Sequence, residues 1–165
     1  MNIQQALDHW PLPDKNWEAF DLPFSIGGGR PEFLGTGADT RILMKCFRNR
    51  QDSSLNGHIW FSDRCFGPPG FVHGGISAYI LDEVLGATAW MNGFPSVAME
   101  LKIKYLQLTP LATILKIKST IGQTEGDHIY LSGQITDDEA ILTSVEGCFH
   151  KIDPDRILKA ASQAN

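Results

Sequence analysis

The chain of 165 residues is long enough for one domain with a substantial core, and its 42% hydrophobic and 20% charged residues are ordinary for a globular protein. A net charge of -5 and a pI near 5.4 argue against a nucleic-acid partner. No apolar run is long enough for a membrane span, and the first residues lack the pattern of a signal peptide, so we expect a cytoplasmic protein without a membrane partner. Three cysteines without CxxC spacing indicate reduced thiols.

The beginning of the chain is predicted to be an accessory segment. Residues 2–10 have the pattern of a short helix, which Pro11 and Pro13 terminate. The irregular stretch that follows contains Gly27–Gly29, which lack the other residues of a P-loop, so we interpret it as a flexible loop. We divide the chain into residues 1–38, the accessory helix and loop, residues 39–153, the main domain, and residues 154–165, a tail with frayed helical character.

The main domain is predicted to contain two strands, one long helix and four more strands, in that order. Two strand-like runs, 41–49 and 57–63, precede an apolar helical block at 75–91, which Asn92 and Gly93 close. Four more strand-like runs follow, at 97–105, 112–121, 127–135 and 141–150, the first with alternating apolar and polar residues. Because the helix is apolar nearly all round, only burial satisfies it. The sequence therefore predicts an α+β domain in which an antiparallel sheet wraps one long helix.

The helical block carries a carboxylate, Asp82, in its middle. Asp82 is either an acid satisfied by a neighbouring donor or lying at the rim of the domain, or a base held on a rigid element for chemistry. Glu83 points about 100° away from it and is interpreted as a half-exposed partner of a strand lysine. The helical projection places Asp82 on a stripe of small residues, opposite the bulky side chains; the stripe consists of Gly75, Ala78, Asp82, Gly86 and Ala89.

Two glycines, Gly74 and Gly75, begin the helix, where backbone N–H groups lack intrahelical acceptors and the helix dipole is positive. They would let a ligand oxygen reach the amides, as in an oxyanion hole, or they only help the chain to turn. Asp82 lies about 10 Å from Gly75 along the axis, too far for one reacting carbonyl. Antiparallel packing of two helices along the small stripe would bring Asp82 of one copy to these glycines of the other. We therefore predict a homodimer with two composite sites.

Several motifs resemble the hotdog-fold acyl-CoA thioesterases of the PaaI-like group. They are GFVHGG at 70–75, the acid nine residues after His73, MELKIKYLQLTP at 99–110 and the final GCFHKID, and the resemblance covers about residues 56–153. It implies the hotdog fold, dimers that often pair into tetramers, and hydrolysis of a CoA thioester with no cofactor or metal. It also implies that Asp82 activates water or attacks the thioester, that an amide of Gly74 or Gly75 from the partner chain polarises the carbonyl, and that His73 has a structural or catalytic part at the helix entrance.

Two positions depart from the pattern of that family. Gly67 stands where many relatives carry Asn or Gln, and Ala98 stands where they often have Thr or Ser. Each loss removes a hydrogen-bonding group worth about 1–3 kcal/mol of transition-state stabilisation. Asp63, Arg64 or Glu100 are the residues that could substitute.

Other functions stay open beside the thioesterase. A non-catalytic acyl-CoA or acyl-carrier-binding module would explain Gly67 and Ala98, and a hydratase would need a suitably placed Asp–His pair. The spacing of His58, Asp63, Cys65 and His73 fits no known metal-ligand frame. Four lysines fall two apart, as on solvated strand faces, although such a patch could also receive phosphates; they are Lys102, Lys104, Lys116 and Lys118. The acyl group and the choice between base and nucleophile for Asp82 are undecided.

Overall fold

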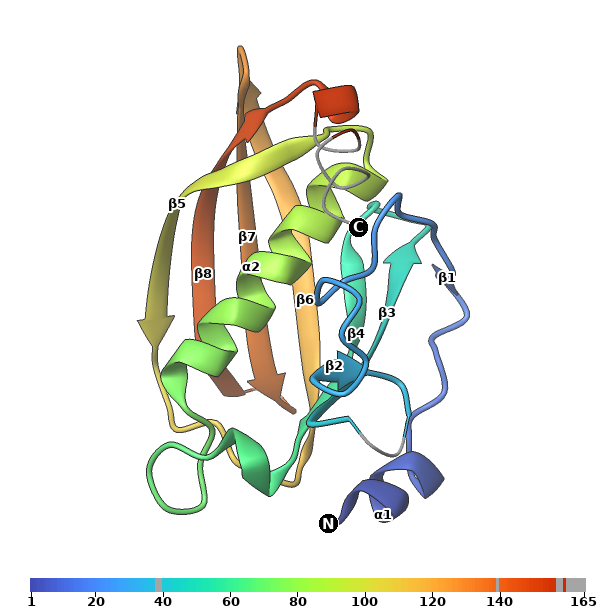
Figure 1. Ribbon diagram of the computed structural model, residues 1–165, viewed down its shortest axis with the longest axis vertical. Helices are drawn as coiled ribbons and strands as arrows, with labels where there is room; N and C mark the ends of the chain where they lie inside the picture. The colour runs from blue at the N-terminus through green and yellow to red at the C-terminus, as the bar shows by residue number, and fades with distance from the viewer. Residues whose placement is uncertain (38–39, 139, 157–158, 160–165) are drawn as a thin grey trace.

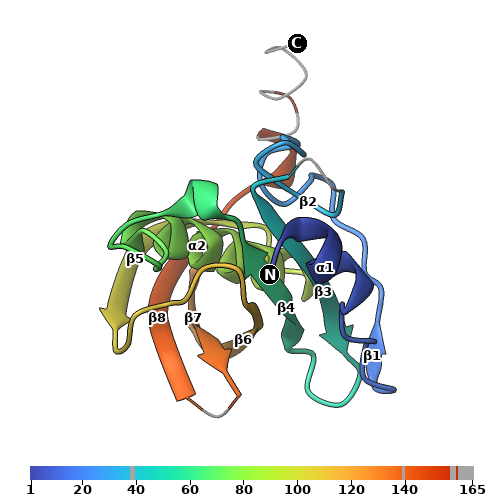
Figure 2. The ribbon, with the colours of Figure 1, turned by 90° about the horizontal axis from the view of Figure 1, so that it is seen from below.

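A computed structural model describes residues 1–37, 40–138, 140–156 and 159, and contains an eight-stranded sheet wrapped around one long helix (Figure 1). The sheet order is β1 (Trp17–Glu18), β3 (Ile42–Asn49), β4 (Leu55–Phe61), β6 (Ile114–Glu125), β7 (His128–Asp137), β8 (Ala140–Lys151) and β5 (Ser96–Tyr105). All these neighbours pair antiparallel, while β2 (Leu34–Gly35) pairs in parallel with β3. The predicted α+β architecture is confirmed, and Figure 2 shows the strands curving around the helix.

The helix α2 (Gly74–Met91) begins and ends with recognisable caps. The His73 Nδ1 accepts a hydrogen bond from the Gly75 N–H at 3.0 Å, which satisfies one of the amides left free at a helix start. At the other end Asn92 is the C-cap, and Gly93 has a φ of 81°, which glycine adopts without strain. The predicted block at 75–91 is therefore confirmed to within one residue.

The core lies between α2 and the concave face of the sheet. Glycines on the sheet let the helix come close: a Cβ at Gly147 would lie 2.8 Å from the Leu85 Cδ1, and one at Gly133 would lie 3.3 Å from Leu85 Cδ2. Burial of a leucine, isoleucine or valine side chain of α2 in this core stabilises the fold by about 1.5–3 kcal/mol. The fully buried apolar residues that α2 contributes are Ile80, Leu81, Val84, Leu85, Ala87 and Ala89.

The N-terminal segment covers both faces of the sheet at the β3 edge. Helix α1 (Ile3–Asp8) packs through Ala6 against Leu43 and Trp60, in a cluster separate from the main core. Leu43 alternates with Ile42 and Met44 of the main core, so α1 lies on the outer face. The loop at 20–36 lies on the inner face, where it packs against the main core. The division of the chain into segments stays a prediction.

Some boundaries differ from those predicted. The second predicted strand, 57–63, is β4 at Leu55–Phe61, followed by a 3-10 turn, η1 (Asp63–Cys65), whose start is capped by the Ser62 hydroxyl. Residues 154–156 of the predicted tail are helical, whereas 157–158 and 160–165 lie outside the described residues. Across the part of the chain that the structure describes, no helix combines the length and apolarity of a bilayer span. Its three cysteines are free thiols.

Candidate active site

Asp82 is half-buried in the middle of α2, and its carboxylate has no hydrogen-bond or ion-pair partner among the described residues. Burial raises the pKa of this carboxyl above its ordinary value of 3.8, because removing a charge from water favours the protonated form. The described residues therefore do not supply the neighbouring donor of a paired structural acid, and an acid at the rim of the domain or a base held for chemistry remain as interpretations. A half-buried acid without a partner, on a rigid helix, is suited to accept a proton or to attack a carbonyl.

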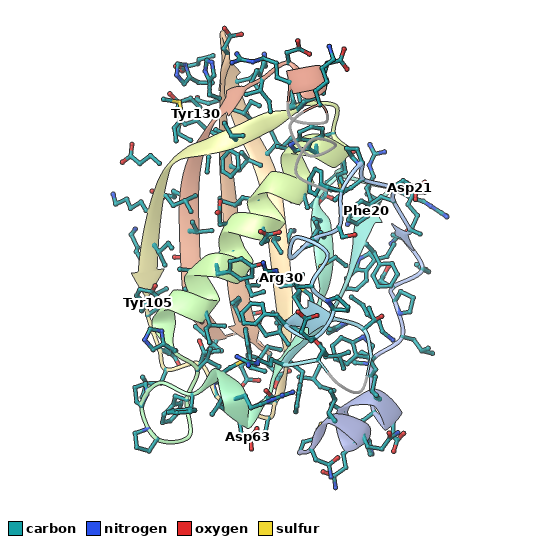
Figure 3. All side chains as sticks on the ribbon, in the orientation of Figure 1. Phe20, Asp21, Arg30, Asp63, Tyr105 and Tyr130 are labelled. Carbon is teal, nitrogen blue, oxygen red and sulfur yellow. The ribbon has the colours of Figure 1, made fainter. Side chains whose placement is uncertain are left out.

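The small stripe around Asp82 is partly exposed, and exposure decreases along it from Gly75 to Ala89. Gly75 is exposed, Ala78 and Gly86 are half-buried, and only Ala89 is fully buried by its own chain. The sheet covers one side of α2 and the 20–36 loop covers another (Figure 3). Between these two covers, the chain leaves a strip of helix on which another backbone can pack closely, with Asp82 at its centre.

Two aromatic contacts and a hydrogen bond to Glu83 hold the loop at 20–36 on α2. Phe24 packs edge-on against Trp90, and Phe33 packs edge-on against Tyr79, with centroids 5.2 and 5.4 Å apart. The Glu83 carboxylate accepts a hydrogen bond from the Gly27 N–H at 2.7 Å. The interpretation of Glu83 as a partner of a strand lysine is therefore wrong. Gly27 has a φ of 81°, and this turn in the loop is what brings its amide to the helix.

The first turn of α2 holds its two glycine amides differently. The Gly75 N–H donates to His73 Nδ1, whereas the Gly74 N–H has no acceptor in the described chain. The Gly74 carbonyl oxygen accepts a hydrogen bond from the Tyr105 hydroxyl at 3.0 Å, and Tyr105 is labelled at the end of β5 in Figure 3. The peptide between Gly74 and Gly75 is thus held from both sides, and the Gly74 amide is the free donor. Sequence reasoning missed Tyr105, because nothing in its strand pattern marks a contact with the helix start.

The backbone around Gly67 explains the first departure from the family pattern. A Cβ at Gly67 would lie 2.7 Å from the His73 Cα and 3.0 Å from the His73 N. The His73 N–H donates to the Cys65 carbonyl at 2.9 Å, and the Gly67 N–H donates to the Phe71 carbonyl at 2.8 Å, which closes a tight loop. The chain before α2 therefore takes a path that admits no side chain at this position.

The residues considered as substitutes do not gather at Asp82. Asp63 lies in η1 at the lower end of the molecule in Figure 3, with Arg64 beside it in sequence. Glu100 is exposed and lines a hollow with residues of β6, β7 and β8, while Ala98 adjoins a β-bulge in β5. No described group of three or more His, Cys, Asp or Glu side chains could hold a metal.

The two histidines that were considered as metal ligands, His58 and His73, make different contacts in different parts of the structure. His58 on β4 lies between the rings of Trp10 and Trp17, at centroid distances of 6.3 and 5.7 Å. Burial, together with the charge of Lys116, lowers its pKa. His58 therefore belongs to the contact of the N-terminal segment with the sheet, whereas His73 caps α2.

Strand β5 is one of the two edges of the sheet, opposite β1, and its apolar residues are less buried than the alternation predicted. Leu101 and Ile103 pack against the core, whereas Val97, Met99 and Tyr105 are 43%, 61% and 55% exposed. A β-bulge between Ala98 and Glu100 interrupts the alternation. A ten-residue edge strand with exposed apolar side chains is a template for pairing with another strand.

No protein-family model matches the chain. It is 36% identical over 94 residues to acyl-coenzyme A thioesterase THEM4 of Rattus norvegicus, a match that covers 56% of this chain and 40% of that protein. It is 29% identical over 85 residues to acyl-coenzyme A thioesterase THEM5 of Mus musculus, covering 50% of this chain and 34% of that protein. The chain thus spans less than half the length of the curated relatives that it matches.

Solved structures share the fold across more of the chain. A thioesterase superfamily protein is 27% identical with a TM-score of 0.67, covering 90% of this chain and 72% of that one. A Streptococcus mutans protein bound to acetyl CoA is 18% identical with a TM-score of 0.59, and the match covers 66% of this chain and 86% of that one. The E. coli PaaI protein is 13% identical with a TM-score of 0.59, covering 68% and 80%. These matches confirm the predicted resemblance and the wrapped-helix architecture.

Proposed function

We propose that this chain, which has the hotdog fold and is similar to acyl-CoA thioesterases, hydrolyses acyl-CoA to a free acid and CoA. The observation that carries the proposal is Asp82, a half-buried carboxylate that has no partner among the residues the structure describes, on a partly exposed strip of the helix. A module that only bound CoA would have no use for a desolvated base on that strip. The match to a structure bound to acetyl CoA supports CoA as the ligand type.

The chemistry needs a base or nucleophile and a donor for the carbonyl oxygen. In one route Asp82 takes a proton from water as the water oxygen bonds to the thioester carbon; in the other, the carboxylate attacks that carbon and water later hydrolyses the anhydride. In both, the C–S bond breaks and the CoA sulfur leaves as a thiolate that takes up a proton. The Gly74 N–H is the donor that we assign to the oxyanion, since His73 already occupies the Gly75 amide.

The partner chain completes each site in this proposal. Asp82 and Gly74 lie eight residues apart on one helix, about 12 Å along its axis, so they cannot meet at one carbonyl within one chain. Pairing of two β5 edges would cover Val97 and Met99 and bring two open helix strips together. The proposed active form is therefore a homodimer with two composite sites, and association of two such dimers is a further step that these residues do not require.

His73 has a positioning role in the proposed mechanism. Its Nδ1 accepts from the Gly75 N–H, which assigns the ring proton of neutral His73 to Nε2. This bond fixes the turn that presents the Gly74 amide.

The location of the protein in the cell stays a prediction. The described residues contain three free thiols and no membrane-spanning helix, and we propose a cytoplasmic location.

The test is thiol release from a panel of aliphatic and aromatic acyl-CoAs by wild type and by Asp82→Ala. We expect turnover of at least one class by wild type and a loss of about 10²–10⁴-fold in kcat for the variant. Glu83→Ala, the neighbouring acid that holds the loop instead, is the matched control and retains most activity. Tight CoA binding by wild type with no thiol release from any acyl-CoA would reject the enzyme and identify a binding module.

A further inference from the structure

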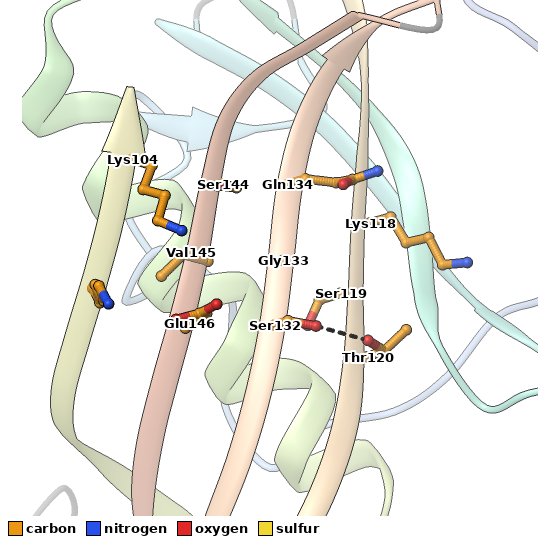
Figure 4. Close-up of a pocket in the computed structure, with 11 residues that line it drawn as sticks. Lys104, Lys118, Ser119, Thr120, Ser132, Gly133, Gln134, Ser144, Val145 and Glu146 are labelled. Atoms are coloured by element: carbon orange, nitrogen blue, oxygen red, sulfur yellow. Dashed lines mark hydrogen bonds between the residues drawn. The ribbon is translucent and has the colours of Figure 1, made fainter. Parts of the chain in front are cut away.

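A hollow on the outer face of the sheet, on the side away from α2, is not used by the proposed reaction (Figure 4). It has a volume of about 340 Å³ and is lined by residues of the four neighbouring strands β5, β8, β7 and β6. Asp82 and Gly74 lie on α2, behind the sheet in this view, so the sheet separates the hollow from them.

Strand register places a lysine at each end of one row across the hollow. Lys104 pairs with Ser144, Ser144 pairs with Gln134, and Gln134 pairs with Lys118. Neighbouring strands are about 4.8 Å apart, so the Cα atoms at the two ends of the row are about 14 Å apart. Two four-carbon side chains can lean from these ends over the shorter residues between them, which lets both ammonium groups approach one anion.

The next row adds hydroxyl donors and a third lysine. Lys102 pairs with Glu146, which pairs with Ser132, and Ser132 pairs with Thr120. The hydroxyls of Ser132 and Thr120 are 3.1 Å apart, and each retains hydrogen-bonding capacity toward a ligand.

The charges around the hollow favour an anion. The three lysines of the two rows outnumber Glu146, the one acid that lines this hollow, and Glu100, the one further acid of the adjoining hollow, in a chain whose net charge is -5. Lys118 also approaches Asp52 at 3.9 Å, but both side chains are about half exposed, and such surface pairs contribute little. Lys118 is therefore free to turn toward a ligand, and the hollow is locally positive on a negative protein.

A second, more apolar hollow of about 440 Å³ adjoins the first and shares Lys102, Ser132 and Glu146 with it. It continues past Gly147 and Cys148 to the ring of Tyr130. An aromatic ring beside a cluster of ammonium groups offers a stacking surface next to an anion site. The two hollows together have room for a charged group and a flat organic group.

We propose that this outer face binds a small organic phosphate, with its phosphate groups between Lys104 and Lys118 and its ring against Tyr130. Ammonium groups and hydroxyls are donors suited to phosphate oxygens, and a hollow of this size holds a small molecule and not a macromolecule. The inference does not depend on thioesterase activity. The same chemistry is carried by a free nucleotide and by the nucleotide end of CoA, and binding measurements separate the two.

The experiment is calorimetric titration of the full chain with pyrophosphate, ADP and CoA at low and at physiological salt. We expect ADP to bind more tightly than pyrophosphate, and the Lys104→Gln/Lys118→Gln double variant to lose at least tenfold in affinity for both. Tyr130→Ala should weaken the binding of ADP and leave the affinity for pyrophosphate unchanged. The matched control is Lys15→Gln/Lys116→Gln, which removes the same charge outside the hollow, and which should bind as wild type does.

The outcomes separate a specific site from general attraction. If the double variant loses affinity for ADP but keeps its affinity for CoA, the hollow binds a separate nucleotide. If it loses affinity for both equally, the hollow binds the nucleotide end of CoA. Both results support the proposal. Absence of binding of ADP and pyrophosphate to wild type at about 10 mM, or an equal loss in the control variant, overturns it.

Discussion

The Tyr105 hydroxyl donates a hydrogen bond to the Gly74 carbonyl oxygen at 3.0 Å, and this bond ties the end of β5 to the first turn of α2. The ring also lies against Gly74, since a Cβ there would be 3.2 Å from the Tyr105 Cε1. Because β5 is the edge strand at which we propose the dimer contact, Tyr105 fixes the helix start relative to that contact. The free Gly74 amide thereby has a defined place at that contact.

Replacement of Tyr105 by Phe should reduce kcat by about 3–10-fold and leave KM unchanged, because the amide loses its support in the transition state while the ring still packs. Steady-state thiol release checks this split. Ser96→Ala is the control, since the Ser96 hydroxyl likewise donates to a backbone carbonyl, that of Phe94 at 3.0 Å, at the opposite end of β5 from Tyr105. A fall in melting temperature with unchanged kcat would show that Tyr105 is only structural.

The activity should depend on pH through Asp82. Burial raises the pKa of this carboxyl above 3.8, and both proposed routes need the ionised form. The value of kcat/KM should therefore fall as the pH drops through the raised pKa, with an acid limb centred above 3.8. An acid limb at or below the ordinary value would contradict the assigned environment.

The same raised pKa makes Asp82 a cost to stability at neutral pH. The folded state binds the proton more tightly than the unfolded state, so the contribution of Asp82 to stability is lost as the pH rises from the unfolded to the folded pKa. Asp82→Asn should then raise the melting temperature at pH 7 by about 1–2 °C, the small size reflecting partial exposure. The gain should vanish below pH 3.8, where wild-type Asp82 is protonated in both states.

Restoring the family-type side chain at Gly67 should harm the protein. A Cβ there meets the His73 backbone at 2.7 Å, and relief of that contact would displace the turn into α2. Gly67→Asn should lower stability by about 1–3 kcal/mol and reduce kcat. Gly37 has nothing within 4 Å of a Cβ and no positive φ, so Gly37→Asn is the mild control. Increased activity in Gly67→Asn would show that the loop adapts.

The bond between Glu83 and Gly27 should control the opening of the 20–36 loop. Removing the carboxylate in Glu83→Ala breaks a charge-assisted hydrogen bond of 2.7 Å and should speed amide exchange in residues 20–30 by about fivefold. Hydrogen exchange followed by mass spectrometry measures this rate. Glu32→Ala, which removes an exposed acid from the same loop, should exchange as wild type does. Equal exchange in Glu83→Ala would mean that the rings alone hold the loop.

The fold was largely predictable because its signals are local and strong. The apolar helix with a glycine start and an Asn–Gly end, and the alternating strands after it, leave few arrangements other than a wrapped sheet. The burial of β5 was less predictable, because alternation indicates two faces but cannot show that a strand lies at an edge. Val97 and Met99 are exposed for that reason.

The site was predicted in part. The position of Asp82 on a small stripe follows from helical periodicity, and the structure leaves that stripe partly exposed from Gly75 to Gly86. Contacts between distant segments have no local signal in the sequence. The hydrogen bond from Tyr105 to Gly74 joins residues 31 positions apart, and the one from Gly27 to Glu83 joins residues 56 positions apart. The close approach of Gly67 to His73 is equally invisible in the sequence, where the glycine only marks a missing amide side chain.

The most direct test of the composite site is a complementation assay with two inactive variants. Gly74→Pro removes the free amide at the first helical position, which accepts proline, and His73 has the ψ of 129° that a residue before proline requires. Gly74→Ala adds a Cβ but keeps the N–H, and serves as its control. Asp82→Asn supplies the other defect.

When Gly74→Pro and Asp82→Asn chains are unfolded together and refolded as a mixture, thiol release should recover to about a quarter of the wild-type rate. Half of the dimers then contain both variants, and one of the two sites in each is intact. A mixture as inactive as its separate components, in a sample shown to contain mixed dimers, would contradict a site shared between two chains.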